Sequence, residues 1–203
     1  MRKLYLALLP ALLLALALGL TACGGGGESD EDAVVETIET SATSSDPADC
    51  EALSTQKFME QTEAVKGSKA VKSCEEEAED PEGDPESVDV SNVVVDGSKA
   101  TADTAFNGGN FDGQTLAVAL VEEDSDWKLD EVTGFAKFDQ DKLVENFEEL
   151  FQSGEEPLEP PVVTCMGEVF GELSKPEFEE LLFGGSQQPI IEIAEGCQEG
   201  LQQ

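Results

Sequence analysis

The chain has 203 residues, and its 45 acidic side chains outnumber 11 basic ones, which gives a formal net charge of −34. This charge argues against nucleic acid as a partner, because nucleic-acid binding depends on Lys and Arg neutralising phosphates. It suits a well-solvated surface, and it would also attract cations or a basic protein partner. The sequence has no histidine, and its single tyrosine and single arginine are Tyr5 and Arg2. The length fits one domain of ordinary size with an appendage.

The N-terminus has the parts of a secretory signal. A basic start, Met1-Arg2-Lys3, precedes an apolar run from Leu4 to Leu20, and small residues follow at Thr21 and Ala22. The four residues Leu20-Thr21-Ala22-Cys23 resemble the lipobox of bacterial lipoproteins. That resemblance implies cleavage after Ala22 and a diacylglyceryl group on Cys23. Without a twin-arginine pair, general secretion is the expected route. An ordinary signal peptide or an uncleaved membrane helix is the alternative, although about 17 apolar residues is short for a span.

Residues 1–22 are therefore predicted to be a removed signal peptide, and residues 23–32 a glycine-rich and acidic tether. Two acyl chains hold a protein stably on a bilayer, whereas one holds it only marginally. The mature chain would contain 181 residues, with 9 Lys against 45 acids and a net charge of −36. We expect it on the extracytoplasmic face of the membrane. The lipid must anchor it, because this surface repels anionic headgroups.

Four cysteines remain after lipidation, and an extracytoplasmic compartment permits disulfides. They allow three pairings. We favour Cys50–Cys74 and Cys165–Cys197, because neither pair has a predicted strand between its members. Each bridge would close a loop of roughly 25 to 33 residues and contribute about 3–4 kcal/mol. No C-x-x-C spacing is present, so a zinc site is not expected, and we predict no cofactor.

The first part of the mature chain is predicted to be helical. Val34, Val35, Ile38 and Ala42 lie on one face of a helix over 32–43. Asp46-Pro47 predicts an N-cap followed by proline at the first helical position, and a short helix through Leu53. Two further helices are expected at 55–62 and 69–79. The acidic stretch 80–86 contains two prolines and a glycine, and is expected to be a loop.

An antiparallel meander should follow. Strands are predicted near 88–95, 99–106, 116–121 and 127–132. Asp96-Gly97 between the first two predicts a hairpin with a type I′ turn, which needs positive φ at both central residues. Asp124-Ser125-Asp126 begins like a calcium loop, but Leu129 stands where glycine is required, so we expect a turn. Helices followed by a meander indicate an α+β fold.

At this point the chain resembles the nuclear transport factor 2-like superfamily, also described as the cystatin-like cone. The resemblance rests on segments 46–53, 93–100 and 127–129, which read DPADCEAL, VVVDGSKA and WKL. It implies a curved four-stranded sheet wrapped around the N-terminal helices, with a pocket at the open end of the cone. We assign residues 33–153 to this domain. The lone Trp127 is expected to be core, although such a side chain can also stack a ligand.

The C-terminal part is predicted to be helical again. An amphipathic helix begins near Asp139, and its apolar face carries Leu143, Val144, Phe147, Leu150 and Phe151. Residues 154–161 are expected to be a proline-rich linker. Residues 162–203 are expected to form an appendage of two or three short helices, clamped by Cys165–Cys197. Ser174-Lys175-Pro176-Glu177 has the form of a capping box.

The mature chain lacks the residue types that most often carry catalysis. Without His there is no ordinary base near neutral pH, and without Arg there is no bidentate clamp for phosphate or carboxylate. Ketosteroid isomerases, which share the cone, use a tyrosine that is missing here. Asn107-Gly108-Gly109-Asn110 lacks the spacing of a nucleotide-binding loop. We therefore predict no catalytic residue, and a cone that binds a small apolar ligand or a protein partner.

Two other functions stay open. One is a carboxylate-dependent isomerase or hydratase, which an acid buried in an open pocket would favour. The other is a purely structural envelope protein with a filled cone. If the cone only binds, the strand acids should face solvent or satisfy turns. These are Asp89, Asp103, Asp130 and Glu131.

Overall fold

The computed structural model describes residues 29–79, 83–153 and 157–201. The predicted signal peptide, the lipidation site Cys23 and most of the tether lie outside these residues. Helix α1 (Asp30–Thr43) begins with a capping box, in which the Ser29 and Asp32 side chains bond each other's backbone N–H. The last three residues of the predicted tether, 30–32, are therefore helical.

Three short helices follow close to where the sequence predicts them: α2 (Ala48–Leu53), α3 (Gln56–Thr62) and α4 (Ser68–Glu79). The Asp46 carboxylate accepts a hydrogen bond from the Ala48 N–H at 3.0 Å, so it acts as a cap although the helical turn starts at Pro47. Thr55 caps α3 in the same way, because its hydroxyl accepts from the Phe58 N–H at 3.2 Å.

The sheet is an antiparallel meander in the order β1-β2-β3-β4. Its strands are β1 (Ser87–Asp96), β2 (Lys99–Asn107), β3 (Thr115–Glu123) and β4 (Asp126–Lys137). The mixed α+β class and the four-stranded antiparallel sheet are thus confirmed. β4 runs five residues beyond its predicted end, through irregularities in its pairing with β3.

All three hairpins of the meander form, but the turn type predicted for the first is wrong. Asp96 pairs with Lys99, so the central residues are Gly97 and Ser98, and only Gly97 has a positive φ, of 61°. The type I′ turn predicted at Asp96-Gly97 is therefore not formed. Two successive positive φ angles occur instead in the β3–β4 hairpin, at Asp124 and Ser125. This position confirms that Asp124-Ser125-Asp126 is a turn.

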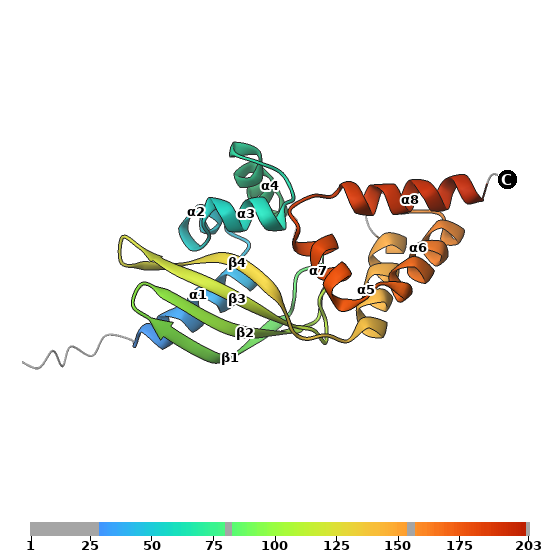
Figure 1. The fold of residues 1–203 in the computed structure, drawn as a ribbon. Helices are drawn as coiled ribbons and strands as arrows, with labels where there is room; N and C mark the ends of the chain where they lie inside the picture. Colours follow the sequence, from blue (N-terminus) through green and yellow to red (C-terminus); the bar gives the residue numbers. More distant parts are fainter. Residues whose placement is uncertain (1–28, 80–82, 154–156, 202–203) are drawn as a thin grey trace, which may run out of the picture.

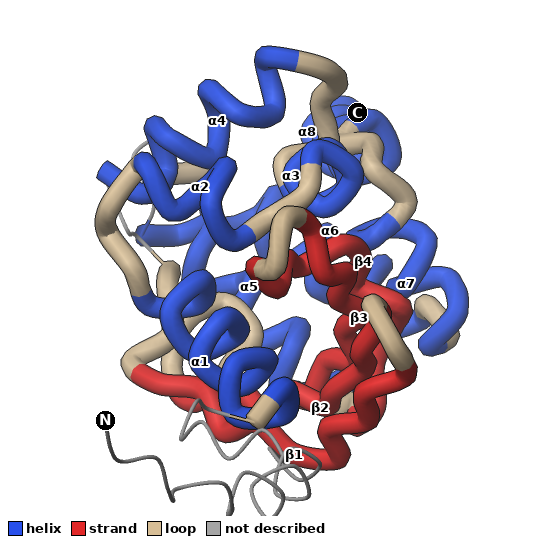
Figure 2. Tube along the Cα trace, turned by 90° about the vertical axis from the view of Figure 1, so that its left-hand side faces the viewer, coloured by secondary structure: helices blue, strands red, loops and turns tan. Residues whose placement is uncertain are grey.

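One face of the sheet carries the core. α1 packs against β1 and β4, and α3 packs against β4, as Figures 1 and 2 show. Val34 and Ile38 of α1 join inward-facing strand residues such as Leu120 and Leu129 in one cluster. The predicted core position of Trp127 is confirmed, since only 6% of it is exposed.

The free edge of β4 is covered by polar groups of neighbouring elements. An unpaired strand edge is a template for aggregation unless its backbone groups are bonded or blocked. Here three backbone groups of β4 have partners outside the sheet. The bonds are Thr55 N–H to the Leu129 carbonyl at 2.8 Å, Val132 N–H to Gln61 Oε1 at 2.8 Å, and Phe135 N–H to Glu179 Oε1 at 2.8 Å.

The C-terminal region forms four helices beside one end of the sheet (Figure 1). They are α5 (Gln140–Ser153), α6 (Pro160–Glu172), α7 (Lys175–Phe183) and α8 (Gln188–Gly200). α6 begins inside the predicted linker, because proline is compatible with the first helical turn. The Ser174–Glu177 capping box is confirmed, with the Ser174 N–H 2.7 Å from the Glu177 carboxylate.

Phenylalanine rings connect this helical region to the sheet. Nine of the ten phenylalanines form a continuous series of ring contacts, with centroids 4.8 to 6.4 Å apart. The series runs through β2, β4, α5, α6 and α7, and the tenth ring, Phe58, lies on α3. The nine are Phe106, Phe111, Phe135, Phe138, Phe147, Phe151, Phe170, Phe178 and Phe183. Residues on both sides of 154–161 therefore share one hydrophobic core.

The disulfides are Cys50–Cys74 and Cys165–Cys197, which is the favoured pairing. The first joins α2 to α4, and the second joins α6 to α8. Each bridge therefore holds two helices together. The paired cysteines are 24 residues apart in the first bridge and 32 residues apart in the second.

Candidate ligand-binding cavity

A cavity of about 320 Å³ lies between the inner face of the sheet and helices α1–α4. Its floor consists of strand side chains, among them Leu116, Val118, Leu129 and Val132. Exposed residues such as Glu77 also line it, so the cavity reaches the surface on the side of α4. Its volume is at the lower end of the range for small-molecule sites.

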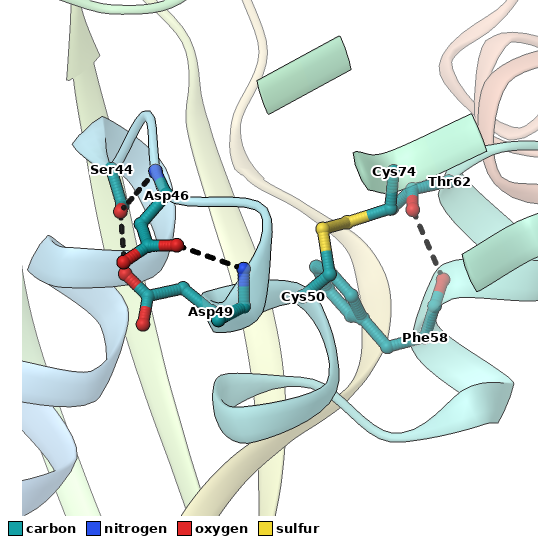
Figure 3. Close-up of a disulfide and its surroundings, with 8 residues drawn as sticks. Ser44, Asp46, Asp49, Cys50, Phe58, Thr62 and Cys74 are labelled. Carbon is teal, nitrogen blue, oxygen red and sulfur yellow. Dashed lines mark hydrogen bonds between the residues drawn. A yellow bond between two sulfur atoms is a disulfide. The ribbon is translucent and has the colours of Figure 1, made fainter. Parts of the chain in front are cut away.

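Both cysteines of the Cys50–Cys74 disulfide, which Figure 3 shows, line the cavity. Phe58 of α3 lies beside it and also lines the cavity. A second, small core beneath the disulfide consists of Cys50, Met59 and Ala70. The bridge therefore fixes α4 over the cavity, where few apolar side chains would otherwise hold it.

The C-terminal region also contributes to the wall. Leu182 and Phe183, at the end of α7, line the cavity together with Phe111. The amide of Gln61 donates to the carbonyls of Val132 at 2.9 Å and of Phe183 at 3.0 Å. This side chain ties α3, β4 and the end of α7 together. Helix α7 therefore helps to shape the cavity.

A polar atom in the wall lacks a hydrogen-bond partner. Thr104 on β2 is 1% exposed and lines the cavity, and its hydroxyl is unpartnered among the described residues. A buried hydroxyl without a partner costs about 1–3 kcal/mol. In most folded proteins such a group is satisfied, so an exception calls for an explanation. A ligand group that bonds the hydroxyl from inside the cavity would supply one.

Three carboxylates lie together at the exposed side of the cavity: Glu63, Glu77 and Asp84. Desolvation, with the negative charge of Glu63 beside it, raises the pKa of Glu77 to about 7. Glu77 is an exposed residue, so solvent screens part of this effect. Desolvation and the charge of Glu77 also raise the pKa of Asp84. In both cases desolvation of the carboxyl group is the larger cause, and the negative charge of a neighbouring acid adds to it.

The loop that carries Asp84 is held by the turn between β2 and β3. The Asn110 N–H donates to the Gly83 carbonyl at 2.9 Å, and Asn110 itself lines the cavity. Gly109 has a φ of 69°, and a Cβ there would lie 2.4 Å from the Gly83 carbonyl oxygen. Only glycine fits this contact. The turn that the sequence excludes as a nucleotide loop therefore positions the cavity rim.

The four strand acids lie outside this site, as predicted. Asp89 accepts from the Asn107 side chain at 2.9 Å, and Asp103 accepts from the Asn92 side chain at 2.7 Å. Lys57 forms ion pairs with Asp130 at 3.1 Å and with Glu131 at 2.7 Å. None of the four lines the cavity. Among the described residues, no cluster of His, Cys, Asp and Glu is suited to hold a metal ion.

The residues that give the cavity its polarity were not predicted from the sequence. Thr104 follows Ala100 and Ala102 at alternate positions of β2, so a polar side chain in an apolar alternation was the available signal. Glu63, Glu77 and Asp84 carry no comparable signal, since they are three of 45 acids. Their proximity depends on how α3, α4 and the 83–85 loop pack.

No family model, curated protein or solved structure matches the chain. Across 29–79, 83–153 and 157–201, each helix is too short or too polar to span a bilayer. The site must therefore be interpreted from its own geometry.

Proposed function

We propose that this protein is a lipid-anchored, extracytoplasmic binding protein without catalytic activity, and that its cavity takes up a small, mainly apolar ligand. The anchor rests on the lipobox resemblance at Cys23. A curved cone of the nuclear transport factor 2-like type fits a four-stranded antiparallel sheet that packs its inner face on helices. A cavity at that face is where such a fold would hold a ligand.

The observation that carries the proposal is the buried Thr104 hydroxyl. Apolar walls would hold the body of a ligand, and a single polar group would fix its orientation, which is the common design of small-molecule sites. If the cavity had only a structural role, a larger side chain that filled it and a methyl group in place of the hydroxyl would give a more stable fold.

Two matched pairs of variants test this function. Thr104→Val removes the hydroxyl from the cavity, whereas Thr101→Val changes the same residue type on the exposed face of β2. Val118→Phe fills the cavity, whereas Val121→Phe adds the same ring on the opposite face of β3. Small molecules that co-purify with the protein are identified by mass spectrometry. Thr104→Val and Val118→Phe should lose them while the partner variants retain them. Equal retention by all four would contradict the proposal.

The anchor has its own test. Cys23→Ala should either release the protein from the membrane fraction or leave the signal uncleaved, because the thiol is the site of lipidation. A variant that is still lipid-labelled and cleaved after residue 22 would show that the anchor assignment is wrong.

One observation favours a second candidate, a carboxylate-dependent isomerase or hydratase. A general base needs a pKa near the working pH, and the pKa of Glu77 is raised to about 7. We place this candidate second, because Glu77 lies at the exposed side of the cavity and its neighbours are acids rather than donors. Glu77→Gln would abolish turnover of a substrate found by screening, but would leave retention of a merely bound ligand largely intact.

A further inference from the structure

All charged side chains that line the cavity are acidic. They are Asp46, Asp49, Glu63, Glu77 and Asp84, and no lysine is among the lining residues. Asp46 caps α2, and Asp49 accepts a hydrogen bond from the Ser44 hydroxyl (Figure 3). Of the other three, Glu63 and Glu77 lie within hydrogen-bond reach of each other, and Asp84 lies near Glu77. None of the ion pairs formed within the described ranges includes Glu63, Glu77 or Asp84.

This arrangement leaves negative charge uncompensated beside an apolar space. Carboxylates that repel one another and are partly desolvated are unfavourable, unless a cation or a proton neutralises them. Protonation relieves part of the repulsion, which is why the pKa values of Glu77 and Asp84 are raised. A bound cation would relieve it without a proton, and the adjacent apolar wall would hold an attached hydrocarbon.

The unpartnered Thr104 hydroxyl is an independent indication that the cavity receives a ligand. Thr104 lies on the sheet beneath the cavity, whereas Glu77 is on α4 at its exposed side. A ligand that occupies the cavity would thus meet apolar side chains and one hydroxyl within it, and carboxylates at its rim. An alcohol or a carboxylic acid of the same shape would make the apolar contacts with the cavity wall, but would form no ion pair with the carboxylates at the rim.

We infer that the ligand is a cationic amphiphile, with an apolar body between the sheet and α1–α4 and an amino group at Glu63, Glu77 and Asp84. This inference rests on the proposed function and adds the chemical class of the ligand. Hydrogen bonds between charged partners are stronger than those between neutral ones, so an ammonium group should bind about tenfold more tightly than a hydroxyl at the same position.

The test uses the full, lipid-anchored chain in zwitterionic vesicles, at about pH 8, which is above the raised pKa of Glu77. Octylamine, octanol and octanoate serve as probes, because they share a chain and differ only in the headgroup. The thermal unfolding midpoint is followed by the fluorescence of Trp127, the single tryptophan, which is buried in the core. A ligand that binds only the folded state raises the midpoint with its concentration, and this dependence gives an apparent Kd.

Two triple variants separate a local site from the general charge. Glu63→Gln with Glu77→Gln and Asp84→Asn removes the rim carboxylates. The control removes the same number of charges from exposed positions of α6 and α8, through Glu168→Gln, Glu172→Gln and Glu195→Gln. We expect octylamine to bind about tenfold more tightly than octanol in the native protein and in the control. In the rim variant the two should bind with equal affinity.

Each other outcome overturns a specific claim. Equal affinity of octylamine and octanol in the native protein would disprove the cationic headgroup but leave the cavity as a binding site. If both triple variants lost the preference for octylamine over octanol equally, this preference would come from the overall charge of the protein and not from the rim carboxylates. Stabilisation by calcium chloride that only the rim variant loses would replace the amine with a metal ion. If no probe shifts the midpoint and Val118→Phe retains the co-purifying small molecules, the proposed function itself is wrong.

Discussion

The interior around α5–α8 is filled with aromatic rings, whereas the interior between the sheet and α1–α4 contains a cavity, and rings are found only in part of its wall. Phe170 and Phe178 are at most 2% exposed and lie in contact at a centroid distance of 6.1 Å. Phe58, the ring outside the series, lies on the cavity wall and is only partly buried. A protein interior is normally close-packed, so an unfilled region of this size beside a filled one is informative.

The two regions also differ in how they are held together. Helices α5–α7 adhere through a broad apolar core, to which Cys165–Cys197 adds a bridge at α8. α4 belongs to a small core in which only Cys50, Met59 and Ala70 are fully buried, so its position depends heavily on Cys50–Cys74. Stability is thus concentrated on one side and the binding space on the other. Sites that receive ligands are commonly in the less stable parts of a fold.

The largest expected effect comes from removing a ring on the filled side. Phe178→Ala should lower the free energy of unfolding by about 3–5 kcal/mol, because it leaves a hole among rings that cannot close over it. Phe58→Ala should cost less than about half of that, since this ring already faces an open space. Urea unfolding followed by Trp127 fluorescence measures both values. Equal losses would mean that the cavity wall is packed as tightly as the phenylalanine core.

Removal of the two disulfides should separate stability from binding. Replacing both cysteines of either bridge with alanine should cost about 3–4 kcal/mol, because the two closed loops are similar in length. Only the Cys50→Ala, Cys74→Ala variant should also lose the co-purifying ligand, since α4 is no longer fixed over the cavity. Equal ligand retention in the two variants, measured at a temperature where both are folded, would show that the bridge does not shape the site.

The elements could be predicted because their signals are local. Apolar spacing, N-caps and short turns place α1–α5 and the four strands to within a few residues, apart from the C-terminal end of β4. The helices α6–α8 were predicted only as two or three short helices within 162–203. The cysteine pairing also followed from the order of elements. The turn type predicted at Asp96-Gly97 was wrong, because the type depends on the pairing register of the two strands, which places Asp96 opposite Lys99. A local motif does not reveal that register.

The site could not be predicted, because its properties arise from tertiary packing. The Thr104 hydroxyl is an ordinary strand residue until the structure shows that it lacks a partner. Likewise, Glu63 on α3 and Glu77 on α4 are common surface acids in the sequence. Their carboxyl groups come to lie beside each other only when the two helices pack together at the cavity.

The smallest expected effect is a pH dependence that belongs to the cavity side. The pKa of Glu77 is raised from 4.5 to about 7, so the folded state binds a proton more tightly than the unfolded state. Its contribution is therefore fully present below about pH 4.5 and is lost as the pH rises through about 7. Glu77→Gln stays neutral at every pH, so this loss is absent from the variant.

Relative to the native protein, Glu77→Gln should gain stability at about pH 8 and show little change at about pH 4.5. We expect a gain of at most about 1 kcal/mol, because Glu77 is exposed as a residue and solvent screens its charge. Glu195→Gln on α8 removes one charge from an exposed position and corrects for the change in net charge. Thermal unfolding at the two pH values, followed by Trp127 fluorescence, supplies the comparison. If the gain were larger at about pH 4.5 than at about pH 8, the pH dependence would have the opposite sign. Glu77 would then be stabilised as a carboxylate and would need no cation beside it.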